Sequence, residues 1–350
     1  MAAPSSPGPI RLGPGPEFDL IRRFLASAPH GPAAAPAGVG GGEAPVSPRV
    51  RVGPGDDCAL VDGIALSTDL SIEDIHFRRA WLEPEEIGYR ATAAALSDLA
   101  AVAARPIGIL CSLACTPVDA AGYASRVVAG LHEAASELGA ALLGGDLARS
   151  PGPLALDIVV VGEAARPVLR AGARPGDALW VTGELGAAAA AALAWQRGET
   201  PPPAARRAFA RPRARVREAL WLAERGLPHA LIDLSDGLAG DAAHLAAAGG
   251  VKVVLDAEAI PVHPAASAVA GSAEEALRLA LAGGEDYELC FAAAEGAVEA
   301  AADAFQAAFG VTLRRVGRVE EGDGVWIRHG DGGPEPLAAR GYQHFGGQAR

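Results

Sequence analysis

The stretch PEEIGYRATAAALSDLAAVAARPIGILCSLAC, residues 84–115, changes from a helical pattern to a strand pattern and thereby indicates the fold class. Residues 84–104 predict a long helix, because Pro84 suits the first helical position and the two glutamates after it suit the positive helix N-terminus. An Arg-Pro pair then ends the helix, and the apolar run over residues 107–115 predicts a buried strand. A long helix that leads directly into an apolar strand is typical of α/β proteins.

The same alternation continues in both directions along the chain. Further strands are predicted at 64–70, 154–164, 178–182, 230–234, 251–255, 287–291 and 325–328, and further helices at 18–26, 123–138, 187–196 and 237–248. A turn-rich motif at 170–177 opens the second half. Because 350 residues exceed what one core usually organises, we predict an N-terminal α/β domain at 17–165 and a C-terminal α/β domain at 166–350.

Two segments have low complexity. Residues 1–16 are dominated by Pro, Gly and Ser and predict a disordered tail, and residues 29–48 predict a flexible insert ahead of the first strands. Residues 29–48 contain no aromatic residue and no β-branched run, so burial cannot repay their loss of chain entropy on folding.

Composition excludes several classes of protein. Lys+Arg 30 against Asp+Glu 42 gives a net charge of −12, which argues against nucleic-acid or anionic-membrane partners. The sequence offers no apolar run long enough to span a membrane and no secretory signal at its start, so we expect a cytoplasmic protein. The four cysteines include no CxxC pair and are expected to be packed, neutral thiols.

Lys252 is the only lysine, which excludes the Walker A motif because that motif ends in GK[ST]. A phosphate-handling protein of this composition would have to use metal ions, arginine and backbone amides.

Acidic residues occur at turns and strand ends, where carboxylates of separate segments can meet. Asp57 follows a Gly-Pro-Gly turn, Asp69 ends the strand at 64–70, and Asp146 follows two glycines. Asp233 and Asp236 flank Ser235 at a strand-to-helix junction. Each also has an ordinary structural interpretation: a turn former, a loop residue for Asp146, or a helix N-cap for Asp236.

Asp98 resists such an interpretation, because it lies inside an apolar helix, where an unpaired carboxylate is costly to bury. Together with the hydroxyls of Ser67 and Thr68, the acids predict an all-oxygen site for hard cations such as Mg²⁺, which hold phosphate substrates.

The ordered set of motifs resembles the thiamine-monophosphate kinase family. The resemblance extends from about residue 17 to 345, apart from the 29–48 insert. It rests on GDDCALV (55–61), STDL (67–70), IHF (75–77), LSDLAAVAARP (96–106), GGD (144–146), RAGARPGD (170–177), VTGELG (181–186), IDLSDGL (232–238), GGEDYELCF (283–291) and GYQHF (341–345).

This resemblance implies a fold and an activity. Members of the wider superfamily, which includes aminoimidazole ribonucleotide synthetase and selenophosphate synthetase, have two α/β domains with ATP between them and a homodimer interface on the N-terminal sheet. The implied reaction is transfer of the γ-phosphoryl group of ATP to thiamine monophosphate. The acceptor phosphate already carries a nucleophilic oxygen, so no catalytic general base is expected.

The resemblance also implies residue roles. Several Mg²⁺ ions would be held by Asp57, Ser67, Thr68, Asp69, Asp98, Asp146, Asp233 and Asp236. ATP would contact Gly145, Asp146, Arg170 and Ser235, and thiamine monophosphate would contact His76, Glu285 and Tyr342. Without the resemblance, His76 reads equally well as a core histidine, Glu285 as a solvated loop acid and Tyr342 as a packed tail aromatic. The chain departs from the family's usual residues at Asp74, Leu147 and Ala171. These departures affect the expected geometry of the local loops.

Two alternatives remain open. One is another ATP-dependent enzyme of the same superfamily, although no cysteine lies in the N-terminal glycine-rich segment, where selenophosphate synthetase would need one, and the chain does not end in cysteine. The other is a non-catalytic protein that binds Mg²⁺ and nucleotide, which would release no ADP with thiamine monophosphate.

Overall fold

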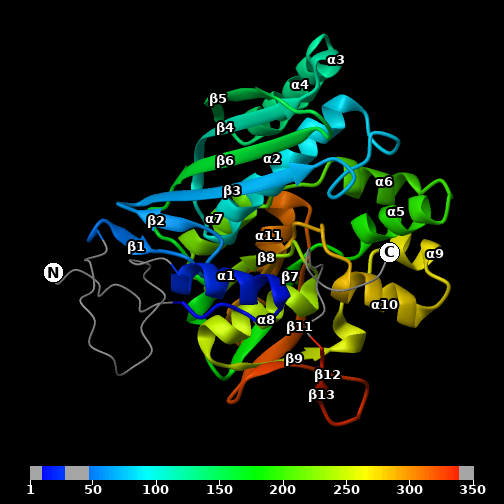
Figure 1. The fold of residues 1–350 in the computed structure, drawn as a ribbon. Helices are drawn as coiled ribbons and strands as arrows, with labels where there is room; N and C mark the ends of the chain where they lie inside the picture. The colour runs from blue at the N-terminus through cyan, green and yellow to red at the C-terminus, as the bar shows by residue number, and fades with distance from the viewer. Residues whose placement is uncertain (1–9, 28–46, 339–350) are drawn as a thin grey trace.

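The computed structural model of the chain describes residues 10–27 and 47–338 (Figure 1). Most of the predicted tail, most of the predicted insert and Tyr342 lie outside the described residues. The structure contains two mixed β-sheets, each with helices packed on it, and the predicted α/β class with two such units is confirmed. No helix in the described ranges is both long and apolar enough to cross a membrane.

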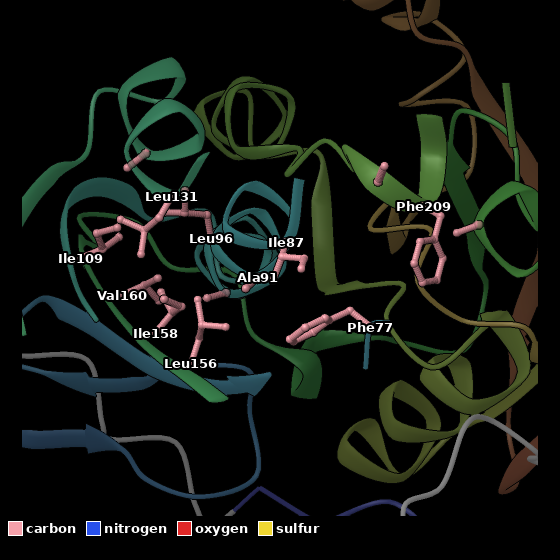
Figure 2. Packing of buried hydrophobic residues seen from close by; sticks show 14 of the residues in the cluster. Phe77, Ile87, Ala91, Leu96, Ile109, Leu131, Leu156, Ile158, Val160 and Phe209 are labelled. Carbon is pink, nitrogen blue, oxygen red and sulfur yellow. The ribbon is translucent and has the colours of Figure 1, made fainter. Parts of the chain in front are cut away.

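The first sheet has the strand order β1-β2-β3-β6-β4-β5. Its strands are β1 (Val50–Val52), β2 (Ala59–Val61), β3 (Ile64–Ile72), β4 (Arg105–Cys115), β5 (Ala141–Arg149) and β6 (Ala155–Glu163). One face is covered by α2 (Pro84–Ala101) and α4 (Tyr123–Glu137), and the short α3 (Pro117–Ala120) precedes α4. Figure 2 shows the resulting core, where Ile158 and Val160 of β6 lie near Leu96 of α2. The alternating burial along β6 therefore leaves its other face uncovered within one chain.

The second sheet has the order β13-β12-β9-β11-β7-β10-β8. Its strands are β7 (Asp177–Thr182), β8 (Pro228–Asp233), β9 (Lys252–Asp256), β10 (Leu289–Ala294), β11 (Leu313–Glu320), β12 (Gly324–Arg328) and β13 (Glu335–Pro336). The helices of this half are α5 (Ala187–Gln196), α6 (Pro203–Ala210), α7 (Val216–Glu224), α8 (Leu238–Gly249), α9 (Pro264–Val269), α10 (Ala273–Ala282) and α11 (Ala302–Phe309), with 3₁₀ turns η1 (Arg170–Gly172) and η2 (Ala257–Ala259).

Both faces of this second sheet are covered. Leu179 and Val181 of β7 pack in the cluster that contains α8, whereas Trp180 packs in the cluster that contains α7 and α11. Alternate residues of one strand thus enter two cores, which explains why β7 is buried along its whole length and reads as a continuous apolar run.

An N-terminal helix, α1 (Pro16–Ser27), crosses from the first half onto the second. The ring of Phe18 packs against the imidazole of His244 on α8, with 4.2 Å between ring centroids. The helix therefore packs on α8, which follows the junction where Asp233 and Asp236 lie.

Several elements differ from the sequence-based predictions. The helix at 84–104 ends at Ala101, and the 201–217 segment forms α6 and the start of α7. β5 was not predicted at all, since its exposed residues and double glycine give it little strand propensity. The predicted strand at 287–291 begins only at Leu289, because Tyr287 has a φ of 51°, which a strand cannot accommodate. The cysteines are packed as expected, with Cys58, Cys115 and Cys290 buried and Cys111 half-buried.

Candidate active site

One cavity collects most of the predicted site residues from both halves of the chain. It has a volume of about 530 Å³ and lies where β3 and α2 of the first half face the β8–α8 junction of the second. Its lining includes Thr68, Asp69, His76 and Asp98 from the first half and Asp233, Ser235, Asp236 and Glu285 from the second. Residues up to 219 positions apart in the sequence, Thr68 and Tyr287, thus border one space.

Three aspartates form the acidic centre of this site. Carboxylate oxygens of Asp57, Asp98 and Asp233 all lie within 4.8 Å of one another. Ser67 Oγ donates to Asp98 Oδ2 at 2.5 Å, whereas Asp233 Oδ2 is buried and accepts no hydrogen bond from the described residues. We call these three residues the aspartate triad. Such close carboxylates repel one another unless a proton or a cation lies among them.

The pKa values of the triad follow from this crowding. Burial raises the pKa of Asp233 to about 7, and the charge of Asp57 adds to the shift. Burial also raises the pKa of Asp98 well above its ordinary value, with Asp233 as the next cause. A divalent cation between these oxygens would remove both the repulsion and the unsatisfied acceptor on Asp233, so the donor set fits a hard metal ion.

Arg170 binds the edge of the triad. Its Nε donates to Asp57 Oδ2 at 2.8 Å and its Nη2 to Asp57 Oδ1 at 2.5 Å, while its backbone N–H donates to Asp56 Oδ2 at 3.1 Å. Burial, followed by the charge of Asp57, raises the pKa of Asp56 to about 7. The bidentate contact fixes the guanidinium plane beside the carboxylates, which suits it to a phosphate group that bridges arginine and metal.

The part of the cavity that His76 and Glu285 line has a different character. The backbone N–H of Ile72 donates to His76 Nδ1 at 3.0 Å, so the imidazole proton lies on Nε2 when the ring is neutral. Glu285 has a φ of 67° and pairs with the buried Arg90. A glutamate in the left-handed region is strained, and such strain concentrates at functional sites. Trp81 adds an aromatic surface to this part of the cavity.

A second group of potential metal ligands borders the site. Asp236, Asp241 and His244 have ligand atoms within 4.8 Å of one another. Asp241 Oδ2 accepts the backbone N–H groups of Asp236 and Gly237, both at 3.1 Å, and thereby holds the turn before α8. Burial lowers the pKa of His244 to about 3, so this imidazole is neutral at physiological pH.

Comparison with known proteins assigns the chain to a family. Family models for the N-terminal and C-terminal domains of AIR synthase related proteins match residues 55–164 and 174–329. A thiamine-monophosphate kinase from Rhodopirellula baltica is 34% identical over 312 residues, which covers 85% of this chain and 92% of the relative. The chain belongs to the thiamine-monophosphate kinase family. A thiamine-monophosphate kinase from Escherichia coli K12 is 35% identical over 309 residues, with 85% and 92% covered.

A solved structure agrees with this assignment. AaThiL complexed with AMPPCP and TMP superposes with a TM-score of 0.75 at 29% identity, over 95% of this chain and 97% of that chain. The resemblance to the thiamine-monophosphate kinase family that the motifs indicated is therefore confirmed, and with it the assignment to a family of phosphotransferases.

Not every residue that the family motifs suggested reaches the cavity. Gly145 and Asp146 lie on β5 and border a different groove, together with Cys111 of β4. The interpretation of Asp146 as a loop residue is wrong, since it pairs with Ser112 of β4 in a parallel ladder. Tyr342 lies outside the described residues.

Three other expectations need correction. Asp69 lies within β3, which continues to Ile72, and does not end the strand. The N-cap of α8 is Gly237 and has no side-chain cap, so the N-cap interpretation of Asp236 is wrong. Glu285 is paired with Arg90 and is not a solvated loop acid.

Some residues of the site gave no signal in the sequence. Asp157 of β6 accepts a 2.5 Å hydrogen bond from Thr68 Oγ1, and its strand reads as an ordinary apolar run. Asp241 and His244 lie three residues apart within α8 and therefore share one face of the helix, and a search of this stretch for ligands on one helix face could have found them.

Proposed function

We propose that this chain transfers the γ-phosphoryl group of ATP to the phosphate of thiamine monophosphate, which yields thiamine diphosphate and ADP. The observation that carries the proposal is the aspartate triad, two of whose members, Asp98 and Asp233, line the same cavity as His76 and Glu285. The similar AaThiL structure contains AMPPCP and TMP, and this supports a nucleotide and TMP as the two ligands.

The metal-binding part of the proposal rests on the carboxylates. Asp57, Asp98 and Asp233 would hold Mg²⁺, with Asp69 and Asp236 further along the cavity and with Ser67 and Thr68 as hydroxyl donors to the carboxylates. Bound Mg²⁺ neutralises charge on the transferring phosphoryl group and on both phosphates. Asp146 remains a proposed ligand from the family motif alone.

Arg170 and Ser235 would bind the donor. Arg170 is fixed by Asp57 and lies beside the triad, so its remaining N–H groups would meet the polyphosphate of ATP. Ser235 lines the cavity between Asp233 and Asp236. Gly145 remains a proposed ATP contact without support from the cavity.

The acceptor side works without a general base. The phosphate monoester of thiamine monophosphate is largely dianionic above its second pKa, near ~6, so its oxygen needs no deprotonation. His76 uses Nδ1 to accept the Ile72 N–H and can only donate from Nε2, which makes it a binding residue. Glu285, whose carboxylate pairs with Arg90, lines the cavity and would face the positively charged thiamine ring. Tyr342 would complete this part of the site.

We also propose a homodimer through the open face and edge of the first sheet. Leu142, Leu143 and Leu147 of β5 are 42%, 53% and 66% exposed, and Leu70 of β3 is 50% exposed. An apolar edge strand of this kind is usually covered by another chain. Light scattering that gives a stable monomer would contradict the dimer.

For the two domains we retain bounds of 17–165 and 166–350, and we place the enzyme in the cytoplasm, where ATP is available.

A coupled ADP-release assay tests the function. ADP release that requires thiamine monophosphate and Mg²⁺ is the expected result. Binding of ATP with no ADP release would instead indicate a non-catalytic nucleotide-binding protein, and release with a different acceptor would indicate another enzyme of the superfamily.

A further inference from the structure

A second large cavity lies behind the wall of the candidate active site. It has a volume of about 720 Å³ and is bordered by α6, the segment before α7, the β7–α5 turn and the start of β11. Residues 285–288 separate the two cavities: Glu285 and Tyr287 line the active-site cavity, whereas Asp286 and Glu288 line the second one. We call this second cavity the arginine pocket.

Five arginines line the arginine pocket, and two of them are held by carboxylates. Arg215 donates to Glu288 through Nε at 2.8 Å and Nη2 at 2.5 Å, and Arg211 pairs with Glu133. These two guanidinium groups are fixed in place and their charge is compensated.

The other three arginines are not compensated. Arg207, Arg213 and Arg314 form no ion pair within the described part of the chain, although the chain as a whole carries a net charge of −12. These three exposed residues border one cavity, so their guanidinium groups are available to donate hydrogen bonds to an anion bound in it.

The acids of the pocket do not balance these charges. Glu288 is already bound by Arg215. Asp286 accepts the backbone N–H of Gly186 at 2.9 Å, and burial raises its pKa to about 8, so it is mostly neutral at pH 7. Glu184 remains as the one other acid of the lining, with His263 Nε2 at 3.9 Å.

The shape and chemistry of the pocket indicate the class of ligand. Guanidinium groups bind phosphate oxygens in a two-pronged manner. Phe, Tyr and Trp are missing from the described residues that line it, so nothing there offers a stacking surface to a nucleobase. We propose that the arginine pocket binds a compact anion with two or more phosphate groups, at a site separate from the catalytic one. Such binding does not depend on the proposed function.

Titration calorimetry of the full chain with inorganic pyrophosphate tests the proposal. The experiment uses 0.15 M NaCl and EDTA, because without Mg²⁺ the aspartate triad repels the anion. One site per chain with a dissociation constant below ~1 mM is expected. Arg207→Gln combined with Arg314→Gln should weaken binding at least ~tenfold, since two charge-assisted contacts are lost. Arg213→Gln alone serves as a second, milder variant.

Matched controls distinguish binding in the pocket from a general effect of net charge. Arg105→Gln combined with Arg166→Gln removes the same charge from exposed arginines outside the pocket and should leave affinity within ~twofold. Asp98→Asn should also leave it unchanged, because the triad is not involved. Equal weakening by both arginine pairs, a change with Asp98→Asn, or no saturable binding to the wild type would overturn the proposal. Circular dichroism checks that each variant is folded.

Discussion

Replacement of Asp233 by Asn should make the protein more stable without metal and almost inactive with it. Asp233 is buried against Asp57 and Asp98, and burial raises its pKa from 3.8 to about 7. The folded state therefore binds more protons than the unfolded chain between pH ~4 and ~7, and the stability of the metal-free protein falls as the pH rises through this window.

The size of the effect follows from the same shift. Each pKa unit corresponds to about 1.4 kcal/mol, so the difference between 3.8 and about 7 costs the metal-free wild type roughly 4 kcal/mol above pH 7. The Asp233→Asn variant would avoid this cost but bury an unsatisfied amide, at about 1–2 kcal/mol. We expect a net gain of about 2 kcal/mol at pH 8 that becomes a net loss of about 1–2 kcal/mol near pH 4, where only the cost of the amide remains.

Turnover of the Asp233→Asn variant in the presence of Mg²⁺ should fall, although its stability without metal rises. A neutral amide holds a divalent cation poorly, and loss of one main electrostatic contact costs more than ~10²-fold in rate. Mg²⁺ should also stabilise the variant less than the wild type. Asp57→Asn and Asp98→Asn should lower turnover by a similar factor.

Urea unfolding in EDTA at pH 4 to 8 and the coupled ADP-release assay in Mg²⁺ measure the two effects. Asp303→Asn, an exposed aspartate on α11, is the matched control and should change neither quantity. An Asp233→Asn variant that is less stable than the wild type at pH 8 in EDTA would refute the role of carboxylate repulsion. Full activity across a magnesium titration would refute the role in metal binding.

Three further predictions concern the substrates and the insert. His76→Asn should raise KM for thiamine monophosphate and leave kcat within about tenfold, because the imidazole binds and does not abstract a proton; a large loss of kcat at saturating substrate would contradict this. Unphosphorylated thiamine should be a very poor acceptor, because its hydroxyl lacks both charge and a nearby base. Rapid-quench experiments should trap no phosphoenzyme, because the phosphoryl group passes directly from ATP to the acceptor. Replacement of residues 29–48 by a short Gly-Ser bridge should leave activity within about threefold, because long surface loops are thermodynamically tolerated; loss of ATP binding would assign the segment to the site.

Local sequence patterns were enough to predict the α/β class and most of the proposed ligand set. Asp98 could be recognised because a carboxylate inside an apolar helix breaks a local pattern, and α2 places it as predicted. Asp57, Asp233 and Asp236 could be recognised because turns and strand-to-helix junctions have local signatures. Helix, turn and junction patterns depend on residues that are neighbours in the chain, and these neighbours can be read from the sequence.

Which of these residues meet could not be predicted from local patterns and depends on the three-dimensional fold. The distances within the triad depend on how two sheets are placed, and no local pattern encodes that placement. The same limit explains why Asp146 lies on β5, apart from the triad, and why Asp157 was overlooked. It also explains the wall between the two cavities, where positive φ angles at Glu285 and Tyr287 send alternate side chains to opposite sides. Contacts between distant segments depend on packing of the whole chain, and packing is a property of the assembled fold.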